Sequence, residues 1–186
     1  IVAIDAYSGE YRWHFQQVHH DIWDYDAPNP VVLFDLEYDG VPRKGLAQAG
    51  KTGWVYILDR VTGEPLVGIE ERTVPQEPRQ ATAATQPFPV GDPFVTQTLD
   101  IPPEGFDLTN QGKIFTPFWD EPILLKRGEA NWPPSTVDPA KGYMYVCAGE
   151  RQAAYSTQTD TDLASSGDRY TGGSMRFAPV PTTGVV

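Results

Sequence analysis

The chain alternates short apolar runs with segments rich in turn-forming residues. The runs are enriched in β-branched and aromatic side chains, which favour strands. They cover residues 1–4, 11–15, 31–34, 54–58 and 143–146. The 18 prolines are spread along the chain and leave few windows long enough for an ordinary helix. The pattern therefore predicts an all-β fold.

The longest proline-free stretch, residues 140–178, has a different composition. After Tyr145 and Val146 it is rich in Ser, Thr, Gly and Asp, and it lacks an apolar stripe at helical spacing. We therefore expect a loop in this stretch.

A recurrent turn links three pairs of the predicted strands. An Asp ends one strand and a Gly four residues later begins the next, at Asp5 and Gly9, Asp59 and Gly63, and Asp138 and Gly142. The Asp side chain can accept backbone N–H bonds in such a turn, and Gly adopts the positive φ that the reversal requires. We therefore expect antiparallel hairpins at residues 1–15, 54–67 and 136–147, in separate and successive sheets.

Repeated hairpins suggest how these sheets are assembled. Arranged around a ring, they form a β-propeller, in which neighbouring sheets bury faces that none could bury alone. A β-sandwich with hairpins of similar sequence is the alternative that the turns leave open.

Composition narrows the classes of partner. The chain has 14 Lys and Arg against 25 Asp and Glu, a formal net charge of -11, and a sequence pI near 4.6. This excess of acidic residues argues against binding to nucleic acid or to an anionic membrane surface. The single cysteine, Cys147, cannot form an internal disulfide, and no apolar run approaches the roughly 20 residues of a membrane-spanning helix.

The first hairpin carries a more specific pattern. Its spacing, Ala3-x-Asp5-x-x-x-Gly9-x-x-x-Trp13, resembles the tryptophan-docking repeat of the quinoprotein alcohol dehydrogenase propellers. In that repeat the Trp of one blade packs against the next blade. The second hairpin has Val67 at the corresponding place.

Further segments extend this resemblance in the same order along residues 1–150. HHDIWDYDAP at residues 19–28 resembles the H-D-x-W-D segment of those enzymes, and GKTGWVYILDR at residues 50–60 resembles the strand of the next blade. VPQ at residues 74–76 and TQPF at residues 85–88 are similar to the membrane glucose dehydrogenase branch. Asn131-Trp132, followed by Val137-Asp138-Pro139, resembles a further strand entrance.

The resemblance implies a fold, cofactors and site residues. The family has an eight-bladed propeller that holds pyrroloquinoline quinone and calcium near its axis, of which this chain is expected to supply about three blades with long loop insertions. Asp24 corresponds to the catalytic carboxylate and calcium ligand, and Lys51 to the cation that faces the quinone carbonyls. Asn131 and the adjoining Trp132 are expected to contact the cofactor. The family's other calcium ligands, a Glu and an Asn, belong to blades outside this chain.

The chemistry of these side chains agrees with the implied roles. A carboxylate within about 2.6–3.2 Å of an alcohol hydroxyl can accept its proton. Calcium prefers oxygen ligands, and it can polarise the acceptor as a Lewis acid. A cation beside a quinone stabilises the negative charge that develops as hydride arrives. Asp24 fits the first role and Lys51 the last.

The remaining polar and aromatic residues of interest are expected to be structural. Adjacent residues in an extended chain point to opposite faces, so His19 and His20 cannot easily bind one metal ion. Packing roles are expected for Trp13, Trp23 and Trp54, and structural or solvent-facing roles for His19, His20, Asp26, Glu70, Glu71, Asp160 and Asp162.

Two classes of function follow. The first is a dehydrogenase that oxidises an alcohol, polyol or aldose, passes electrons to a membrane quinone or cytochrome c, and is located in the periplasm. The second is a non-catalytic propeller scaffold, which has no need of Asp24, Lys51 and Asn131 together. A glycan-binding or glycoside-cleaving propeller has no supporting carboxylate spacing. Because both ends of the sequence lie in apolar runs, residues 1–186 are expected to be one partial domain, truncated at both ends.

Overall fold

The computed structural model describes residues 1–128, 130–157, 173–178 and 183–185. The described chain is built from strands, and its only helices are two three-residue 3-10 turns. The all-β prediction is therefore confirmed. No described helix is long and apolar enough to cross a membrane. The elements are β1 (Val2–Ile4), β2 (Tyr11–His14), β3 (Val32–Tyr38), β4 (Val41–Ala49), β5 (Val55–Asp59), β6 (Ile69–Thr73), η1 (Pro78–Gln80), β7 (Thr85–Pro89), η2 (Asn110–Gly112), β8 (Ile123–Gly128), β9 (Thr136–Asp138), β10 (Tyr143–Tyr145), β11 (Ala148–Thr157), β12 (Gly173–Phe177) and β13 (Thr183–Val185).

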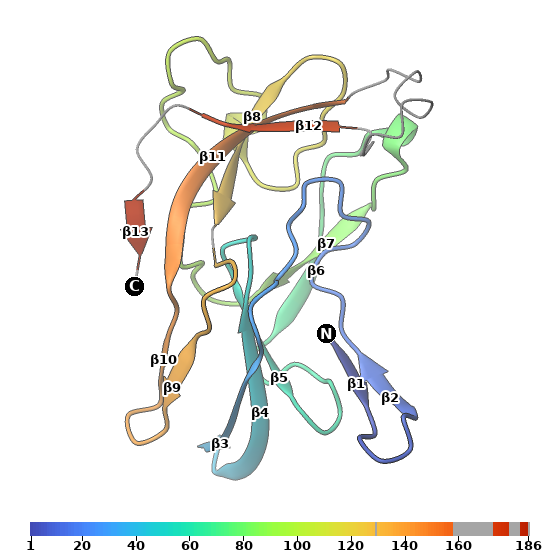
Figure 1. The fold of residues 1–186 in the computed structure, drawn as a ribbon, viewed down its shortest axis with the longest axis vertical. Coiled ribbons are helices and arrows are strands. Elements are labelled where there is room, and N and C mark those ends of the chain that lie inside the picture. Colours follow the sequence, from blue (N-terminus) through green and yellow to red (C-terminus); the bar gives the residue numbers. More distant parts are fainter. Residues whose placement is uncertain (129, 158–172, 179–182, 186) are drawn as a thin grey trace.

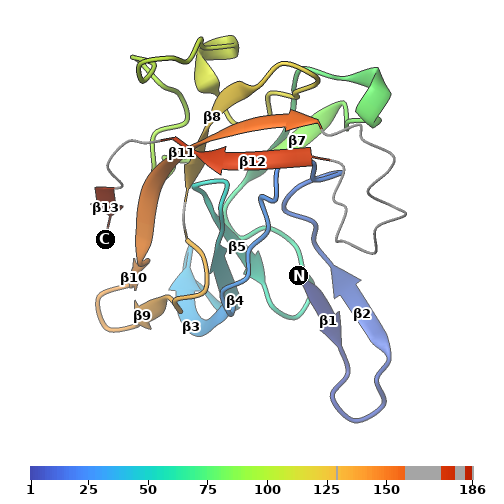
Figure 2. The ribbon, with the colours of Figure 1, turned by 45° about the horizontal axis from the view of Figure 1, so that its top comes forward.

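The strands form several small antiparallel sheets (Figure 1). β1 pairs with β2, β6 with β7, and β9 with β10, while β3, β4 and β5 form a three-stranded sheet. β11 pairs with β8, β12 and β13 in a fifth sheet, of which β8, β12 and one end of β11 lie in the upper part of the molecule in Figures 1 and 2.

The first and third predicted hairpins are present in different sheets, and the second is present as one strand and a single bridge after its turn. Residues 1–15 form β1 and β2, and residues 136–147 contain β9 and β10. Residues 54–67 contain β5, whose Leu58 bridges to Pro65 after the turn. In each turn the Asp carboxylate accepts backbone N–H bonds from the residues two and three positions later. The glycines have φ values of 73°, 80° and 69°, in chain order.

Trp13 joins the first hairpin to the neighbouring sheet. It packs with Leu46 of β4 and Leu58 of β5 and is 9% exposed. A methyl group added at Gly63, in the turn after β5, would lie 2.7 Å from the indole ring of Trp13. The expected docking of a Trp from one hairpin onto the next is therefore confirmed.

The loop predicted for residues 140–178 is wrong in part. Residues 148–157 form β11 and residues 173–177 form β12. The polar sequence of β11 gave no strand signal, because this strand is stabilised by backbone pairing with three other strands rather than by an alternating apolar face. Ala153 and Tyr155 are buried where it pairs with β8. Asp160 and Asp162 lie outside the described residues.

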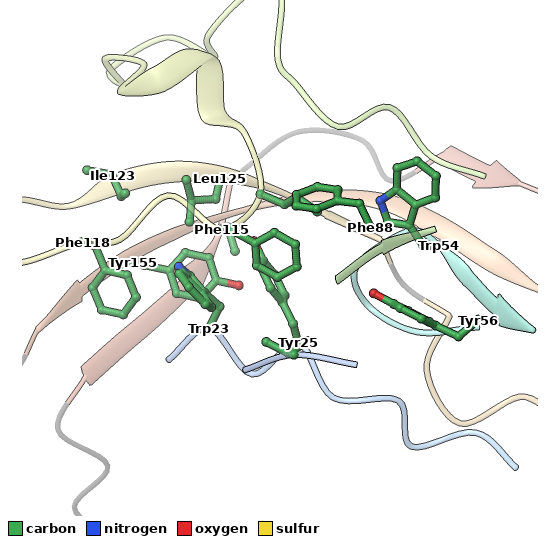
Figure 3. Close-up of a cluster of buried hydrophobic side chains, with 13 residues drawn as sticks. Trp23, Tyr25, Trp54, Tyr56, Phe88, Phe115, Phe118, Ile123, Leu125 and Tyr155 are labelled. Carbon is green, nitrogen blue, oxygen red and sulfur yellow. The ribbon is translucent and has the colours of Figure 1, made fainter. Parts of the chain in front are cut away.

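The main core is an aromatic cluster assembled from distant parts of the chain (Figure 3). Trp23 stacks on Tyr25, with ring centroids 5.6 Å apart. The edge contacts of Phe115 join both rings to Phe88, whose own ring packs edge-on against Trp54. The packing roles expected for Trp23 and Trp54 are therefore observed. This cluster fixes the chain on both sides of Asp24.

Candidate active site

Asp24 lies between two buried aromatic residues. Trp23 and Tyr25 are each 1% exposed, whereas 61% of the Asp24 side chain is exposed. The Trp23 indole N–H donates to the Thr116 carbonyl at 2.8 Å, and the Tyr25 hydroxyl donates to the Lys126 carbonyl at 3.0 Å. Both neighbours are thus anchored in the core, and the carboxylate is presented at the surface.

The backbone of Asp24 has a left-handed conformation, with φ of 60°. This region is unfavourable for residues other than Gly, although Asp tolerates it better than most. Such a conformation persists only where the surrounding structure fixes it, and it is frequent at functional sites. The burial of both neighbouring rings supplies part of that constraint.

Lys51 reaches Asp24 from the turn that follows β4. Its Nζ donates to Asp24 Oδ2 at 3.0 Å and also to Asp26 Oδ1, and only 7% of its side chain is exposed. The Lys51 carbonyl accepts from the backbone N–H of Gly128 at 2.9 Å, which ties this turn to β8. The structure therefore brings together two of the predicted site residues, and it adds Asp26 as a second acceptor for Lys51.

Arg127 is a site residue that the sequence analysis missed. It lies on β8 and is 2% exposed. One guanidinium nitrogen donates to Asp24 Oδ2 at 2.9 Å, and another donates to the Trp23 carbonyl at 3.0 Å and to the Tyr155 hydroxyl at 2.9 Å. The pair Lys126-Arg127 at the end of an apolar strand was the available signal, but nothing in the sequence connected it with Asp24.

The two cations control the charge of Asp24. Partial burial alone would raise the pKa of this carboxyl, but the hydrogen bonds and charges of Lys51 and Arg127 outweigh it and lower the pKa below the ordinary value. Both cations bind Oδ2. Oδ1 accepts no hydrogen bond from the described residues, so one oxygen of an ionised carboxylate is available to a ligand.

Asp24 opens onto a surface pocket of about 590 Å³. Trp23, Tyr155 and Met175 also line it, and burial raises the pKa of Tyr155 to about 12, partly opposed by Arg127. A neighbouring pocket of about 710 Å³ is lined by Tyr25 and Asp26 on the other side of the same segment. The carboxylates at positions 24 and 26 thus face different hollows.

Asn131 and Trp132 follow β8, but no hydrogen bond or ion pair joins them to Asp24 or Lys51 within the described chain. Asn131 is partly exposed as a residue, yet its Oδ1 is buried and lacks a hydrogen-bond partner in the structure. Trp132 is 74% exposed. Their assignment as cofactor contacts therefore stays a prediction, and the unpartnered amide oxygen of Asn131 is compatible with it.

His19 takes part in holding the loop that leads to Asp24. Its backbone N–H and carbonyl form a reciprocal pair of hydrogen bonds with the side chain of Gln86, both 2.8 Å long. Its imidazole Nε2 lies 3.0 Å from Glu71 Oε1. No group of three or more His, Cys, Asp or Glu side chains in the described residues is arranged to hold a metal ion. The hydrogen bonds with Gln86 give His19 a structural role in this loop.

Comparison with known proteins places this chain in a family. The family model for the β-propeller domain of PQQ-dependent glucose, ethanol and alcohol dehydrogenases matches residues 1–175. The chain is 35% identical over 156 residues to the quinohemoprotein alcohol dehydrogenase ADH-IIG of Pseudomonas putida, covering 83% of this chain and 19% of that protein. It is 41% identical over 91 residues to a quinoprotein glucose dehydrogenase of Gluconobacter oxydans, covering 47% of this chain and 11% of that protein.

Solved structures support the same fold. The crystal structure of quinohemoprotein alcohol dehydrogenase from Comamonas testosteroni matches with a TM-score of 0.61 and 22% identity, over 98% of this chain and 26% of that one. A europium-containing methanol dehydrogenase matches with a TM-score of 0.51 and 23% identity, over 91% and 26% of the two chains. The chain spans about a fifth or less of the length of the curated relatives compared above. It belongs to the β-propeller family of the PQQ-dependent glucose, ethanol and alcohol dehydrogenases.

Proposed function

We propose that the protein containing this chain is a quinoprotein dehydrogenase that oxidises an alcohol, polyol or aldose. The observation that carries the proposal is an exposed carboxylate, Asp24, held beside Lys51 on the wall of a pocket. Its relatives bear the names of alcohol, glycerol, glucose and quinate dehydrogenases, which supports a hydroxyl-bearing substrate.

The side chains present fit a quinone and a calcium ion. Oδ1 of Asp24 has no hydrogen-bond donor among the described residues, and Oδ1 of Asn131 is buried without one. Carboxylate and amide oxygens are the ligands that calcium prefers. Asp24 would therefore hold the metal. Lys51, Asn131 and Trp132 would hold the quinone, which supplies the hydride acceptor when bound.

Asp24 would act as the base. Oδ2 is held by Lys51 and Arg127, so the carboxylate cannot rotate freely, and the carboxylate would accept the proton of the substrate hydroxyl. The lowered pKa keeps the group ionised, at some cost in basicity. Lys51 is a fixed and nearly buried cation, and such a charge stabilises an oxyanion that develops beside it more strongly than a solvated one would.

The proposed partners and location rest on the family resemblance. Electrons would pass to a membrane quinone or to cytochrome c, and the protein would act in the periplasm. The net charge of -11 argues against nucleic acid as a partner.

Reconstitution tests the proposed function. The full-length protein is incubated with pyrroloquinoline quinone and Ca²⁺, and dye-linked oxidation of a panel of alcohols, polyols and aldoses is measured. We expect quinone binding, seen by absorbance after removal of free quinone, and turnover that depends on both additions. A folded full-length protein that binds no quinone would instead be a propeller scaffold.

A further inference from the structure

We propose that Arg127 is a positioning residue for Asp24, holding its carboxylate and its left-handed backbone so that Oδ1 faces the pocket. This inference deepens the proposed function and rests on it for the catalytic consequence. Arg127 itself need not touch the substrate or cofactor, because two of its hydrogen bonds are made to the segment that carries the base.

The guanidinium binds the backbone just before Asp24 and also the side chain of Asp24. It donates to the carbonyl of Trp23 at 3.0 Å and to Asp24 Oδ2 at 2.9 Å. The hydroxyl of Tyr155 accepts from it at 2.9 Å and restrains it from β11. A planar guanidinium can serve these separate acceptors at once in a fixed geometry, whereas a Lys ammonium on a flexible stem cannot.

Burial distinguishes Arg127 from a surface cation that happens to lie near a carboxylate. Its side chain is 2% exposed, whereas the Asp24 side chain is 61% exposed. A buried ion pair often stabilises a fold no more than apolar residues of similar volume would. The specific effect of Arg127 is therefore geometric, and it falls on a residue whose φ of 60° requires restraint by its surroundings.

Lys126 provides a matched control on the same strand. It is 6% exposed, and its Nζ lies 3.3 Å from Glu150 Oε1. Successive side chains of a strand point to opposite faces, so the two cations contact different groups. Lys126→Met removes a nearly buried charge from β8 without removing a contact to Asp24.

The test compares Arg127→Met, Arg127→Lys and Lys126→Met in the full-length protein. Hydrogen–deuterium exchange is followed by mass spectrometry on peptides covering residues 23–25, without cofactor. Removing the restraint should raise exchange there by roughly tenfold or more in Arg127→Met, because local opening becomes less costly. Lys126→Met should leave these peptides unchanged, and Arg127→Lys should give a smaller increase.

The kinetic test uses the same variants after reconstitution with the quinone and Ca²⁺. Arg127→Met should lower kcat by roughly 10–100-fold, since a misplaced base costs rate rather than binding, while the substrate KM changes by less than about twofold. Lys126→Met should keep wild-type kcat. Arg127→Lys, which retains the charge, gives the answer if Arg127→Met does not fold, and its kcat should fall between the two.

The outcomes separate this inference from the proposed function. Unchanged exchange at residues 23–25 in both Arg127 variants would overturn the positioning role whether or not the protein is an enzyme. Raised exchange with unaltered kcat would overturn its catalytic consequence. A wild-type protein that binds no quinone would refute the proposed function, while the exchange experiment would still decide whether Arg127 fixes Asp24.

Discussion

The protein uses Asp side chains in two different structural settings. In the hairpin turns, Asp5, Asp59 and Asp138 accept N–H bonds from residues two and three positions later in the chain. At the candidate active site, Asp24 accepts instead from Lys51 and Arg127, which are 27 and 103 positions away. The turns are therefore defined by local sequence, whereas the site exists only when distant strands are assembled.

The two settings also differ in the type of residue that adopts the left-handed backbone conformation. In the turns the positive φ falls on a glycine, such as Gly9 or Gly63, where it carries no steric penalty. At the site it falls on Asp24 itself, between two buried rings and under the guanidinium of Arg127. The turn avoids strain, while the site holds it at the proposed base.

Replacing the base should have the largest effect. Asp24→Asn keeps the shape and an oxygen ligand but removes the proton acceptor, so kcat should fall by roughly 10²–10⁴-fold while quinone binding largely survives. Asp5→Asn is the control from the other setting and should leave turnover unchanged. Dye-linked oxidation by the reconstituted full-length protein measures both, and undiminished turnover in Asp24→Asn would remove Asp24 from the mechanism.

Removing the cation of Lys51 should have the next largest effect. Lys51→Ala should lower kcat by roughly 10²–10³-fold, the usual loss when one preorganised group of this kind is deleted, and should also weaken quinone binding. Lys44→Ala removes an exposed lysine from β4, the strand that precedes the turn of Lys51, and serves as the control. Quinone titration followed by fluorescence, together with kcat, measures the change. Equal behaviour of the two variants would show that Lys51 serves only to neutralise Asp24 and Asp26.

Because Trp13 packs against Gly63, replacing Gly63 should cost more stability than replacing Gly9. Gly9 and Gly63 have φ values of 73° and 80°, but an added methyl group meets nothing within 4 Å at Gly9 and the Trp13 ring at Gly63. Gly9→Ala should therefore lower the free energy of unfolding by about 1 kcal/mol for backbone strain alone. Gly63→Ala adds overpacking and should cost about 2–4 kcal/mol. Urea unfolding compares them, and equal losses would mean that Trp13 moves aside freely.

Much of this architecture could be predicted because its determinants are close together in the sequence. The turn from Asp5 to Gly9 spans only five residues, and each of its hydrogen bonds and its positive φ is found as expected. The family motifs also identified Asp24 and Lys51, which the structure joins at 3.0 Å. Chemistry alone could not have selected these two from the other charged residues.

The parts that escaped prediction depend on long-range pairing. β11 has a polar sequence, and it becomes a strand because β8, β12 and β13 supply backbone partners. Arg127 faces Asp24 only because β8 lies beside the turn of Lys51, where the Gly128 N–H donates to the Lys51 carbonyl. Neither the pairing of β11 nor the contact between Arg127 and Asp24 produces a periodic pattern in the sequence.

The smallest expected effect belongs to the exposed carboxylate of Asp5. Hydrogen bonds from the Ser8 backbone, the Arg12 side chain and the Tyr7 backbone lower its pKa from 3.8 to about 2. A group with a depressed pKa in the folded state stabilises that state above its unfolded pKa, and the contribution is lost as protons bind to the folded form. The stabilisation that the ionised Asp5 carboxylate contributes is therefore lost as the pH falls from about 4 to about 2.

Asp5→Asn tests whether the charge of Asp5 makes the stability of the protein depend on pH in this range. The amide oxygen can still accept from the Tyr7 and Ser8 N–H groups, but the ion pair with Arg12, 2.9 Å long in the structure, is lost and the group no longer titrates. Wild type should be slightly more stable than the variant at pH 5, and the gap should close as the pH falls towards 2, since only the wild-type turn takes up a proton. Urea unfolding at successive pH values measures the gap. A gap that stayed constant over this range would show that the turn derives its stability from backbone geometry rather than from the charge of Asp5.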